Sequence, residues 1–212
     1  LARVLRERCK VALSGEGADE VFAGYSVVYA SAWDFERAPM VNAWPAHQRA
    51  AYETSLEALY GVTHFASQTD HYFRLNSWIP PSLKYRILTD QSLVGAQYDE
   101  PMFQHYAGLL DEVKHLSPMD RYLHLLVQTN LEGLLSRLDS STMAAGVESR
   151  VPFTDPELMR CAFRLRDADK LAFADDRSCA LGQTLNAYEL DQRGFLVSKR
   201  VRREAFRHEV PA

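Results

Sequence analysis

Apolar positions near the start of the chain follow first a helical and then a strand-like pattern. Leu1, Val4 and Leu5 recur at helical spacing, and the short apolar run Val11–Leu13 after them is typical of a β-strand. A small polar residue and two glycines stop that run, and helix-tolerant residues follow. The pattern therefore predicts a helix end, a strand, a tight loop and a helix over about residues 19–29.

The middle of the chain predicts several more helices. Helical spacing indicates helices over residues 47–60, 82–88 and 101–110. Gly61 is expected to end the first of them. Residues 33–46 contain two tryptophans and two prolines and are expected to form an irregular connection. The aromatic stripe in residues 64–79 is typical of core packing.

The longest periodic segment predicts the best-defined helix. Ser117 followed by Pro118 is a favourable N-cap with proline at the first helical position. Asp155 followed by Pro156 predicts a second start of the same kind. The apolar positions of the long helix are Tyr122, Leu123, Leu126, Leu134, Leu135 and Leu138.

Composition places the chain among soluble globular proteins. It has 212 residues, of which 47% are hydrophobic and 25% charged, enough for one sizeable domain or two small ones. A net charge of −4 gives no general basic character, so nucleic acid is not an expected partner. No apolar run reaches the roughly 18 residues of a membrane span. The basic residues between 199 and 207 are expected to form a solvated helix face.

Cysteine content and the first residue add two expectations. The three cysteines, Cys9, Cys161 and Cys179, form no close pair and no metal-ligand spacing, which indicates a reducing, cytoplasmic compartment. Leu1 is not a start methionine, so we expect further sequence to precede it.

The loop after the first strand is the first stretch that points to chemistry. Gly15 and Gly17 let the backbone turn sharply or approach a ligand closely, and such loops are the usual ligand sites of α/β sheets. Three carboxylates, Glu16, Asp19 and Glu20, would repel a bare phosphate, but Mg²⁺ can bridge carboxylates and phosphates. The competing interpretation is ordinary architecture, in which the acids complement a helix dipole. The loop matches neither the Walker A nor the dinucleotide pattern.

A second informative stretch lies before Pro152. Proline pushes the residue before it toward extended backbone, and alternate side chains of an extended segment share one side. Glu148 and Arg150 therefore point together, either into a site or simply into a salt bridge with each other.

These two stretches resemble the synthetase domain of glutamine-dependent asparagine synthetases. Residues 14–25 are similar to the family pattern Ser-Gly-Glu-Gly-x-Asp-Glu-x-Phe-x-Gly-Tyr, and residues 147–155 to Val-Glu-Ala-Arg-Val-Pro-Phe-Leu-Asp. The resemblance implies an α/β fold of the adenine-nucleotide alpha-hydrolase-like (Rossmann-like) type, of which this segment is mainly helical with about one core strand. It implies ATP and Mg²⁺, with aspartate as substrate and ammonia delivered from glutamine by an upstream glutaminase domain of the same chain. It also allows a homodimer.

The resemblance assigns expected roles residue by residue. Ser14 and the Gly15 backbone would contact the nucleotide, and Asp19 would bind the Mg²⁺ that bridges the phosphates. Glu16 would sit at the reacting centre and support adenylate formation or proton handling. The family's pocket is also lined by the residues expected here to be Glu148 and Arg150, and an arginine suits a carboxylate or a phosphate.

Three departures from the family pattern qualify this expectation. Neither the pyrophosphate loop Ser-Gly-Gly-x-Asp-Ser nor the glutaminase domain is found in these residues, which fits an N-terminally truncated synthetase domain over residues 1–212. The family's Lys-x-x-Leu-Arg segment, whose lysine stabilises the adenylation transition state, is expected where Ser178 stands. Residues 171–212 are therefore expected to be a divergent tail, and the chain alone to be inactive.

Two other classes of function stay open at this point. One is a related adenylating, amide-forming enzyme of the lasso-peptide cyclase or β-lactam synthetase type. A glutamate at position 16 favours asparagine synthetase over β-lactam synthetase, which tends to carry tyrosine there. The other is a degenerate, non-catalytic synthetase-like domain with a partner role.

Overall fold

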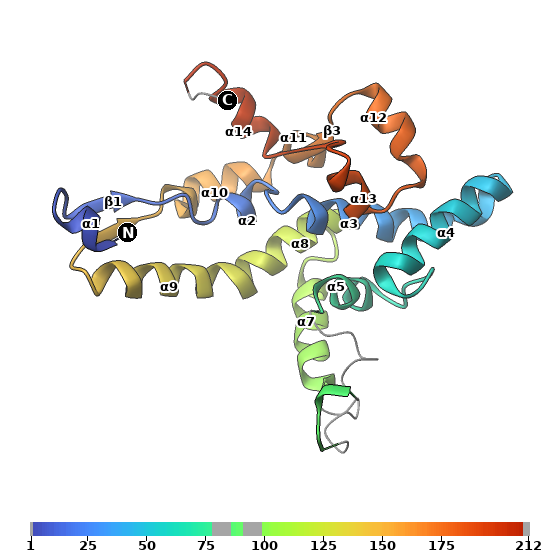
Figure 1. Ribbon diagram of the computed structural model, residues 1–212, viewed down its shortest axis with the longest axis horizontal. Helices are drawn as coiled ribbons and strands as arrows, with labels where there is room; N and C mark the ends of the chain where they lie inside the picture. The colour runs from blue at the N-terminus through green and yellow to red at the C-terminus, as the bar shows by residue number, and fades with distance from the viewer. Residues whose placement is uncertain (1, 78–85, 91–98, 210–212) are drawn as a thin grey trace.

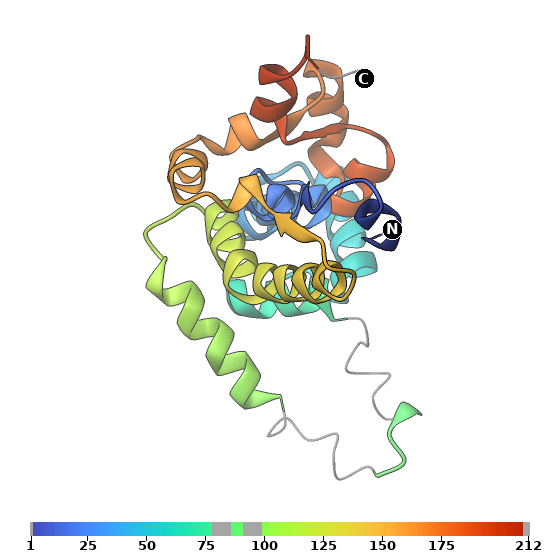
Figure 2. The same cartoon turned by 90° about the vertical axis from the view of Figure 1, so that its left-hand side faces the viewer.

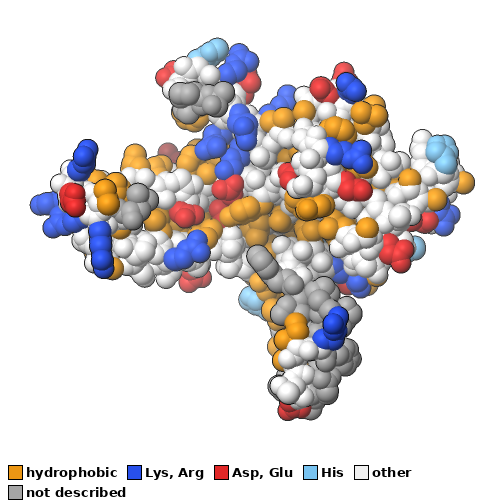
Figure 3. Space-filling model, in the orientation of Figure 1, with side chains coloured by type: hydrophobic (Ala, Val, Ile, Leu, Met, Phe, Trp, Pro, Cys, Tyr) orange, Lys and Arg blue, Asp and Glu red, His pale blue; other side chains and the backbone are white. Residues whose placement is uncertain are grey.

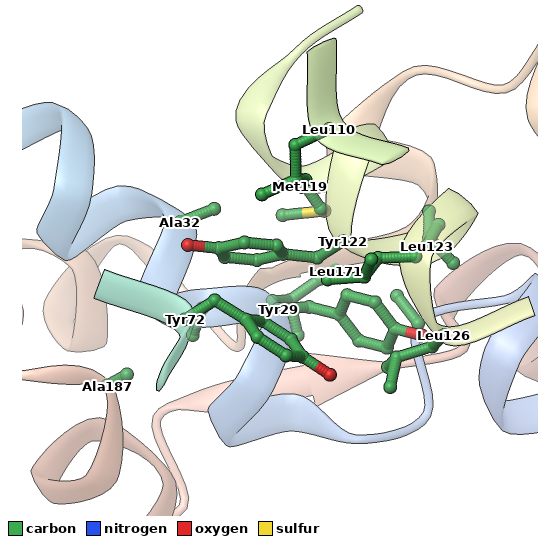
Figure 4. Packing of buried hydrophobic residues seen from close by; sticks show 13 residues of the cluster. Tyr29, Ala32, Tyr72, Leu110, Met119, Tyr122, Leu123, Leu126, Leu171 and Ala187 are labelled. Carbon is green, nitrogen blue, oxygen red and sulfur yellow. The ribbon is translucent and has the colours of Figure 1, made fainter. Parts of the chain in front are cut away.

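Helix α3 (Ser26–Arg37) lies at the centre of the fold (Figure 1). The computed structural model describes residues 2–77, 86–90 and 99–209. Helices α8 (Pro118–Leu126) and α13 (Ala187–Gln192) pack against α3 from distant parts of the sequence. The buried cluster that they share is drawn in Figure 4 and comprises Ala23, Tyr29, Ala30, Ala32, Tyr72, Leu110, Met119, Tyr122, Leu123, Leu125, Leu126, Leu171 and Ala187.

The helix expected over residues 19–29 is two helices. The first, α2 (Ala18–Val21), ends in a turn in which Ala23 has a φ of 55° and the Gly24 N–H donates to the Asp19 carbonyl at 2.9 Å. The turn brings the Tyr25 hydroxyl back onto the Glu20 carboxylate at 2.7 Å. The single helix was therefore a wrong prediction, because this contact between side chains overrides the local helical preference.

The irregular connection expected over residues 33–46 is also mostly helical. Helix α3 continues to Arg37, and a 3₁₀ helix, η1 (Ala38–Ala43), follows it with a proline in its first turn, where proline is tolerated. This segment stays helical because it carries the fully buried Asp34. The Asp34 carboxylate accepts hydrogen bonds from Tyr52, Tyr60 and the Ala187 backbone.

Helices α4 (Ala46–Tyr60) and α5 (Gln68–Asn76) confirm the expected helix and the core stripe as far as residue 77, and Trp78 lies outside the described residues. Gly61 ends α4 with a φ of 71°, as predicted. In the stripe, Tyr72 is buried in the main core, and Phe65 packs in a second cluster around Tyr52 and Leu56.

Helix α7 (Glu100–Glu112) projects from the body of the molecule (Figures 1 and 2). It corresponds to the helix expected over residues 101–110. The helix expected over residues 82–88 lies largely outside the described residues.

The long periodic segment is helical as predicted, with one local change. The Ser117 hydroxyl accepts a hydrogen bond from the Asp120 backbone N–H at 3.1 Å and so caps α8. The chain then passes through a π-helical turn, η4 (Val127–Leu131), into α9 (Glu132–Met143). Single π-turns inside helices are often found at functional sites.

Two short sheets replace the single expected core strand. After α1 (Ala2–Arg6), strand β1 (Val11–Leu13) pairs in parallel with β2 (Glu148–Arg150). Strand β3 (Leu171–Phe173) pairs antiparallel with β4 (Leu196–Ser198). The described residues thus hold four short strands in a mainly helical α/β chain, because the segments around residues 149, 172 and 197 become strands only through pairing.

The C-terminal segment folds back onto the central helix (Figure 1). Trp33 of α3 stacks on Phe173 of β3 with ring centroids 5.1 Å apart, and the fully buried Lys170 forms an ion pair with Asp120 of α8. The remaining elements are η5 (Pro152–Thr154), α10 (Pro156–Phe163), α11 (Asp167–Lys170), α12 (Asp176–Leu181), η6 (Gly182–Thr184) and α14 (Arg200–Ala205). The Asp155 carboxylate caps α10, as predicted.

No helix within residues 2–77, 86–90 and 99–209 is long and apolar enough to cross a membrane. The three cysteines are all free thiols.

Candidate functional site

The parallel pair of strands brings the two informative stretches together. Leu13, the last residue of β1, stands in register with Arg150, the last residue of β2. The Ser14 N–H donates to the Arg150 carbonyl at 2.8 Å, so the pairing continues into the first residue of the loop. Because parallel strands end at the same edge, the loop after β1 and the segment after β2 lie side by side (Figure 2).

Two glycines shape the loop after β1 in different ways. Gly17 has a φ of 86°, and a β-carbon there would lie 3.0 Å from the Thr154 methyl group, so the loop is packed closely against η5. A β-carbon on Gly15 would meet nothing within 4 Å. The Ser14 hydroxyl accepts a hydrogen bond from the Glu16 N–H at 3.3 Å. The loop is thus fixed on one side and open at Gly15.

Glu148 and Arg150 point to the same side of β2, as their spacing predicts. A guanidinium nitrogen of Arg150 lies 2.7 Å from a carboxylate oxygen of Glu148, and the two side chains are 65% and 52% exposed. Arg150 also lines an open hollow of about 420 Å³ next to Ser149, Thr154 and Asp155. An ion pair this exposed contributes little to stability, roughly 0–1 kcal/mol, so both groups are available to a ligand.

Asp19 is paired with a residue that sequence reasoning assigned to a solvated face. The Lys199 ammonium lies 2.6 Å from the Asp19 Oδ1, and the two side chains are 16% and 36% exposed. Ser178, where the family's lysine was expected, is instead buried in α12, with its backbone N–H bonded to the Asp175 carboxylate at 2.7 Å. The structure therefore corrects the expectation for Lys199, whereas Arg200, Arg203 and Arg207 are exposed as expected.

A sequence signal for Lys199 does exist. Residues 199–203 read Lys-Arg-Val-Arg-Arg, which has the lysine and the final arginine of Lys-x-x-Leu-Arg at the right spacing. Arginine in place of the leucine and the later position along the chain hide the match.

Glu20, the third carboxylate of the loop region, is a buried structural group. Its Oε1 accepts hydrogen bonds from the Tyr25 hydroxyl at 2.7 Å and from the Asn130 amide at 2.8 Å. Burial, and then the neighbouring Glu20, raise the pKa of the Tyr25 hydroxyl well above its usual range. Asn130 lies in the π-turn, so this hydrogen bond connects the π-turn to α2. The sequence holds no local signal for this contact.

Helix α14 is held against α2 through a layer of rings. The Arg202 guanidinium lies 5.7 Å from the centroid of the Phe153 ring, and Phe153 in turn packs edge-on against Phe22 at 6.1 Å. Basic side chains gather from α14 toward the middle of the molecule, where acidic side chains adjoin them (Figure 3). Basic side chains thus adjoin acidic ones on this face, and Lys199 beside Asp19 is one such pair.

These residues fit Mg²⁺ carried by a nucleotide better than a metal held by protein alone. Within the described ranges, no group of three or more His, Cys, Asp or Glu side chains is placed to hold a metal ion. Asp19 is partly exposed, and Mg²⁺ is commonly held by one or two carboxylates plus substrate phosphates.

Comparison with known proteins gives a consistent picture. The family model described as asparagine synthase matches residues 1–212. Curated proteins of Mycobacterium bovis and of two Mycobacterium tuberculosis strains, each named "Putative asparagine synthetase (glutamine-hydrolyzing)", are 29% identical to it over 177 residues. That alignment covers 81% of this chain but only 26% of each relative, so the chain spans about a quarter of their length. No solved structure matches the chain significantly.

Proposed function

Because this chain belongs to the asparagine synthase family, we propose that it is the synthetase part of an ATP-dependent, amide-forming ligase that makes asparagine. An oxygen of the aspartate side-chain carboxylate attacks the α-phosphorus of ATP, and pyrophosphate leaves. Ammonia then attacks the acyl carbon of the β-aspartyl adenylate, AMP leaves, and the nitrogen loses a proton. The observation that carries this proposal is the pairing of Leu13 with Arg150, which brings the two family motifs to one edge of the sheet.

The residues of the joined motifs suit these steps. Ser14 and the open backbone at Gly15 lie where a nucleotide can approach. Asp19 would hold Mg²⁺, which when bound offsets charge on the leaving pyrophosphate. Glu16, half-buried in the loop, would sit at the reacting centre and handle the proton released during amination.

Glu148 and Arg150 would complete the pocket from the second strand. The exposed Arg150 guanidinium can bind a carboxylate or phosphate through two parallel hydrogen bonds. Its present partner, Glu148, would then be free to orient the aspartate ammonium group or the incoming amine.

Lys199 supplies the lysine that the family uses in adenylation. Its ammonium reaches the loop from the end of β4 and lies beside the proposed Mg²⁺ ligand Asp19. A fixed cation there stabilises the negative charge that develops on the α-phosphate and the leaving pyrophosphate.

The wider protein follows from the same proposal. Residues 1–212 form the C-terminal portion of an adenine-nucleotide alpha-hydrolase-like (Rossmann-like) domain, with residues 171–212 as a tail that has diverged in sequence. A glutaminase domain upstream in the same chain supplies ammonia from glutamine. The enzyme acts in the cytoplasm, and the resemblance allows a homodimer.

Product formation tests this proposal. The full-length natural protein is incubated with aspartate, Mg·ATP and either ammonium or glutamine, and the products are identified by mass spectrometry. Asparagine and AMP in equal amounts are expected. Amide formation only with a peptide or β-amino-acid substrate would favour the cyclase or β-lactam type, and no AMP with any acceptor would favour a non-catalytic domain.

A further inference from the structure

Gly24 belongs to the first motif, but none of the proposed chemical steps uses it. Its N–H donates to the Asp19 carbonyl at 2.9 Å and closes the turn after α2. A β-carbon built on Gly24 would lie 1.8 Å from the Asp19 Oδ1 and 2.3 Å from the Lys199 Cε. Both distances are far below any real contact, and both target atoms belong to the same ion pair. The missing side chain of Gly24 therefore leaves the slot in which this pair forms.

Lys199 enters the slot from a constrained piece of backbone. It follows β4 directly and has a φ of 53°, which is left-handed backbone that lysine seldom adopts. Its carbonyl accepts from the Arg203 N–H at 2.9 Å, and the preceding Ser198 carbonyl accepts from the Arg203 guanidinium at 2.9 Å. The base of the lysine is thus held in place, and its side chain runs past Gly24 to Asp19.

We propose that Gly24 is a positioning residue that seats Lys199 on Asp19, and that Lys199 and a divalent cation compete for the Asp19 carboxylate. The inference rests on the proposed function, which makes Asp19 the Mg²⁺ ligand. With no cation bound, the lysine neutralises Asp19. Cation binding releases the ammonium, which is then free to turn toward the phosphates of the nucleotide. The Asp19 carboxylate is thereby neutralised by Lys199 before the nucleotide arrives and by the cation afterwards. The Lys199 ammonium then pairs with the phosphates.

Competition between Lys199 and the cation should change the affinity of Asp19 for the cation by a modest, measurable factor. A partly exposed ion pair contributes about 0.2–1 kcal/mol, so removing the lysine strengthens cation binding by a factor of about 1.4 to 5. The gain is expected in Lys199→Met, which keeps the length of the side chain and leaves Gly24 unchanged. A lysine with a purely structural role would give no gain.

The experiment combines two readouts on the full-length natural protein, each taken without nucleotide and again with a non-hydrolysable ATP analogue. Mn²⁺ binding is followed by electron paramagnetic resonance, with Asp19→Asn to identify the share of binding that depends on Asp19. The reactivity of the Lys199 amine is followed by acetic anhydride labelling and peptide mass spectrometry. Lys114, an exposed lysine just after α7 that pairs with Asp111 at 3.1 Å, is the internal reference.

The expected result is that Mn²⁺ raises the labelling rate of Lys199 by a factor of about 1.4 to 5 and leaves that of Lys114 unchanged. In Gly24→Ala the new methyl group displaces the pair, so Lys199 reacts at the higher rate with or without Mn²⁺. If Gly24→Ala fails to fold, Lys199→Met still reports the competition through its tighter Mn²⁺ binding.

Two results overturn the inference, and they are distinguishable. Asp19-dependent Mn²⁺ binding with no change at Lys199, and no gain in Lys199→Met, means that the two cations share Asp19 without competing. The proposed metal role then stands. If no Mn²⁺ binding depends on Asp19 even with the ATP analogue present, both the competition and the proposed metal role fall.

Discussion

The Asn130 amide donates a hydrogen bond to the buried Glu20 carboxylate at 2.8 Å and ties the π-turn of the long helix to the helix that carries Asp19. Asn130→Ala removes this donor and leaves the Tyr25 hydroxyl as the remaining hydrogen-bond donor to the buried carboxylate among the described residues, so we expect a loss of about 1.5–3 kcal/mol of unfolding free energy. Urea denaturation measures this loss, provided that the m-value is the same in the variant and the wild type.

A matched control exists on the surface of α7. Gln104 donates from the same type of amide to Glu100 at 2.5 Å, but in full contact with solvent. We expect Gln104→Ala to change the unfolding free energy by no more than about 0.5 kcal/mol. Equal effects of the two substitutions would show that the Asn130 contact does not support the loop.

Substitution by alanine is expected to have opposite effects on stability at Gly17 and at Gly133. Gly17→Ala forces a side chain into left-handed backbone, with φ 86°, and toward the Thr154 methyl group at 3.0 Å, so we expect a loss of about 1–3 kcal/mol. Gly133 lies in α9 with open space around it, so Gly133→Ala should gain about 0.5–1 kcal/mol. Thermal unfolding of both variants checks the signs, and a gain at Gly17 would contradict the described loop.

Asp34 is expected to be the most sensitive carboxylate in the helical body. Asp34→Asn removes the charge of a fully buried carboxylate that pairs with the partly buried Arg37 at 2.9 Å and accepts hydrogen bonds from Tyr52 and Tyr60, so a loss of about 3–5 kcal/mol is predicted. Asp111→Asn provides the control, because it removes an exposed pair of the same i, i+3 spacing and should cost under about 1 kcal/mol. Comparable losses of unfolding free energy in the two variants, measured by urea denaturation, would show that burial of Asp34 does not make its contacts more stabilising.

His71 makes stability depend on pH. Burial lowers the pKa of its imidazole to about 3, while Asp70 acts weakly in the opposite direction. Below about pH 6.5 the unfolded chain takes up a proton that folded His71 does not, so stability is present above that pH and is lost as pH falls toward 3. Between about pH 7 and 5.5, the wild type should lose about 1 kcal/mol more than His71→Leu.

Urea denaturation at the two pH values measures this difference. The imidazole faces Tyr60 and Tyr122, and its Nε2 has no hydrogen-bond partner in the described part of the chain. Parallel pH dependence of the two proteins would mean that His71 is protonated in the folded state.

Local signals in the sequence were sufficient for helix ends and for the two motifs. Gly61, Ser117 and Asp155 act through neighbouring residues, so the starts and ends that they mark were predicted. Extended backbone before Pro152 likewise predicted that Glu148 and Arg150 share one side.

Contacts between distant segments account for what was not predicted. The break at Ala23 depends on Tyr25 reaching Glu20, and strand β2 exists because it pairs with β1 across more than a hundred residues. Lys199 reaches Asp19 only after the C-terminal segment folds back, and its basic neighbours resemble a solvated helix face. Assignment of the catalytic and metal-binding roles stays a prediction.

Exchange of label between pyrophosphate and ATP tests the central claim most directly, because it requires reversible adenylation of the acceptor. With the full-length natural protein and Mg²⁺, we predict exchange that depends on aspartate and falls by about a hundredfold or more in Lys199→Met, while Lys114→Met matches the wild type. Exchange that ignores aspartate, or that is undiminished without Lys199, would contradict the account.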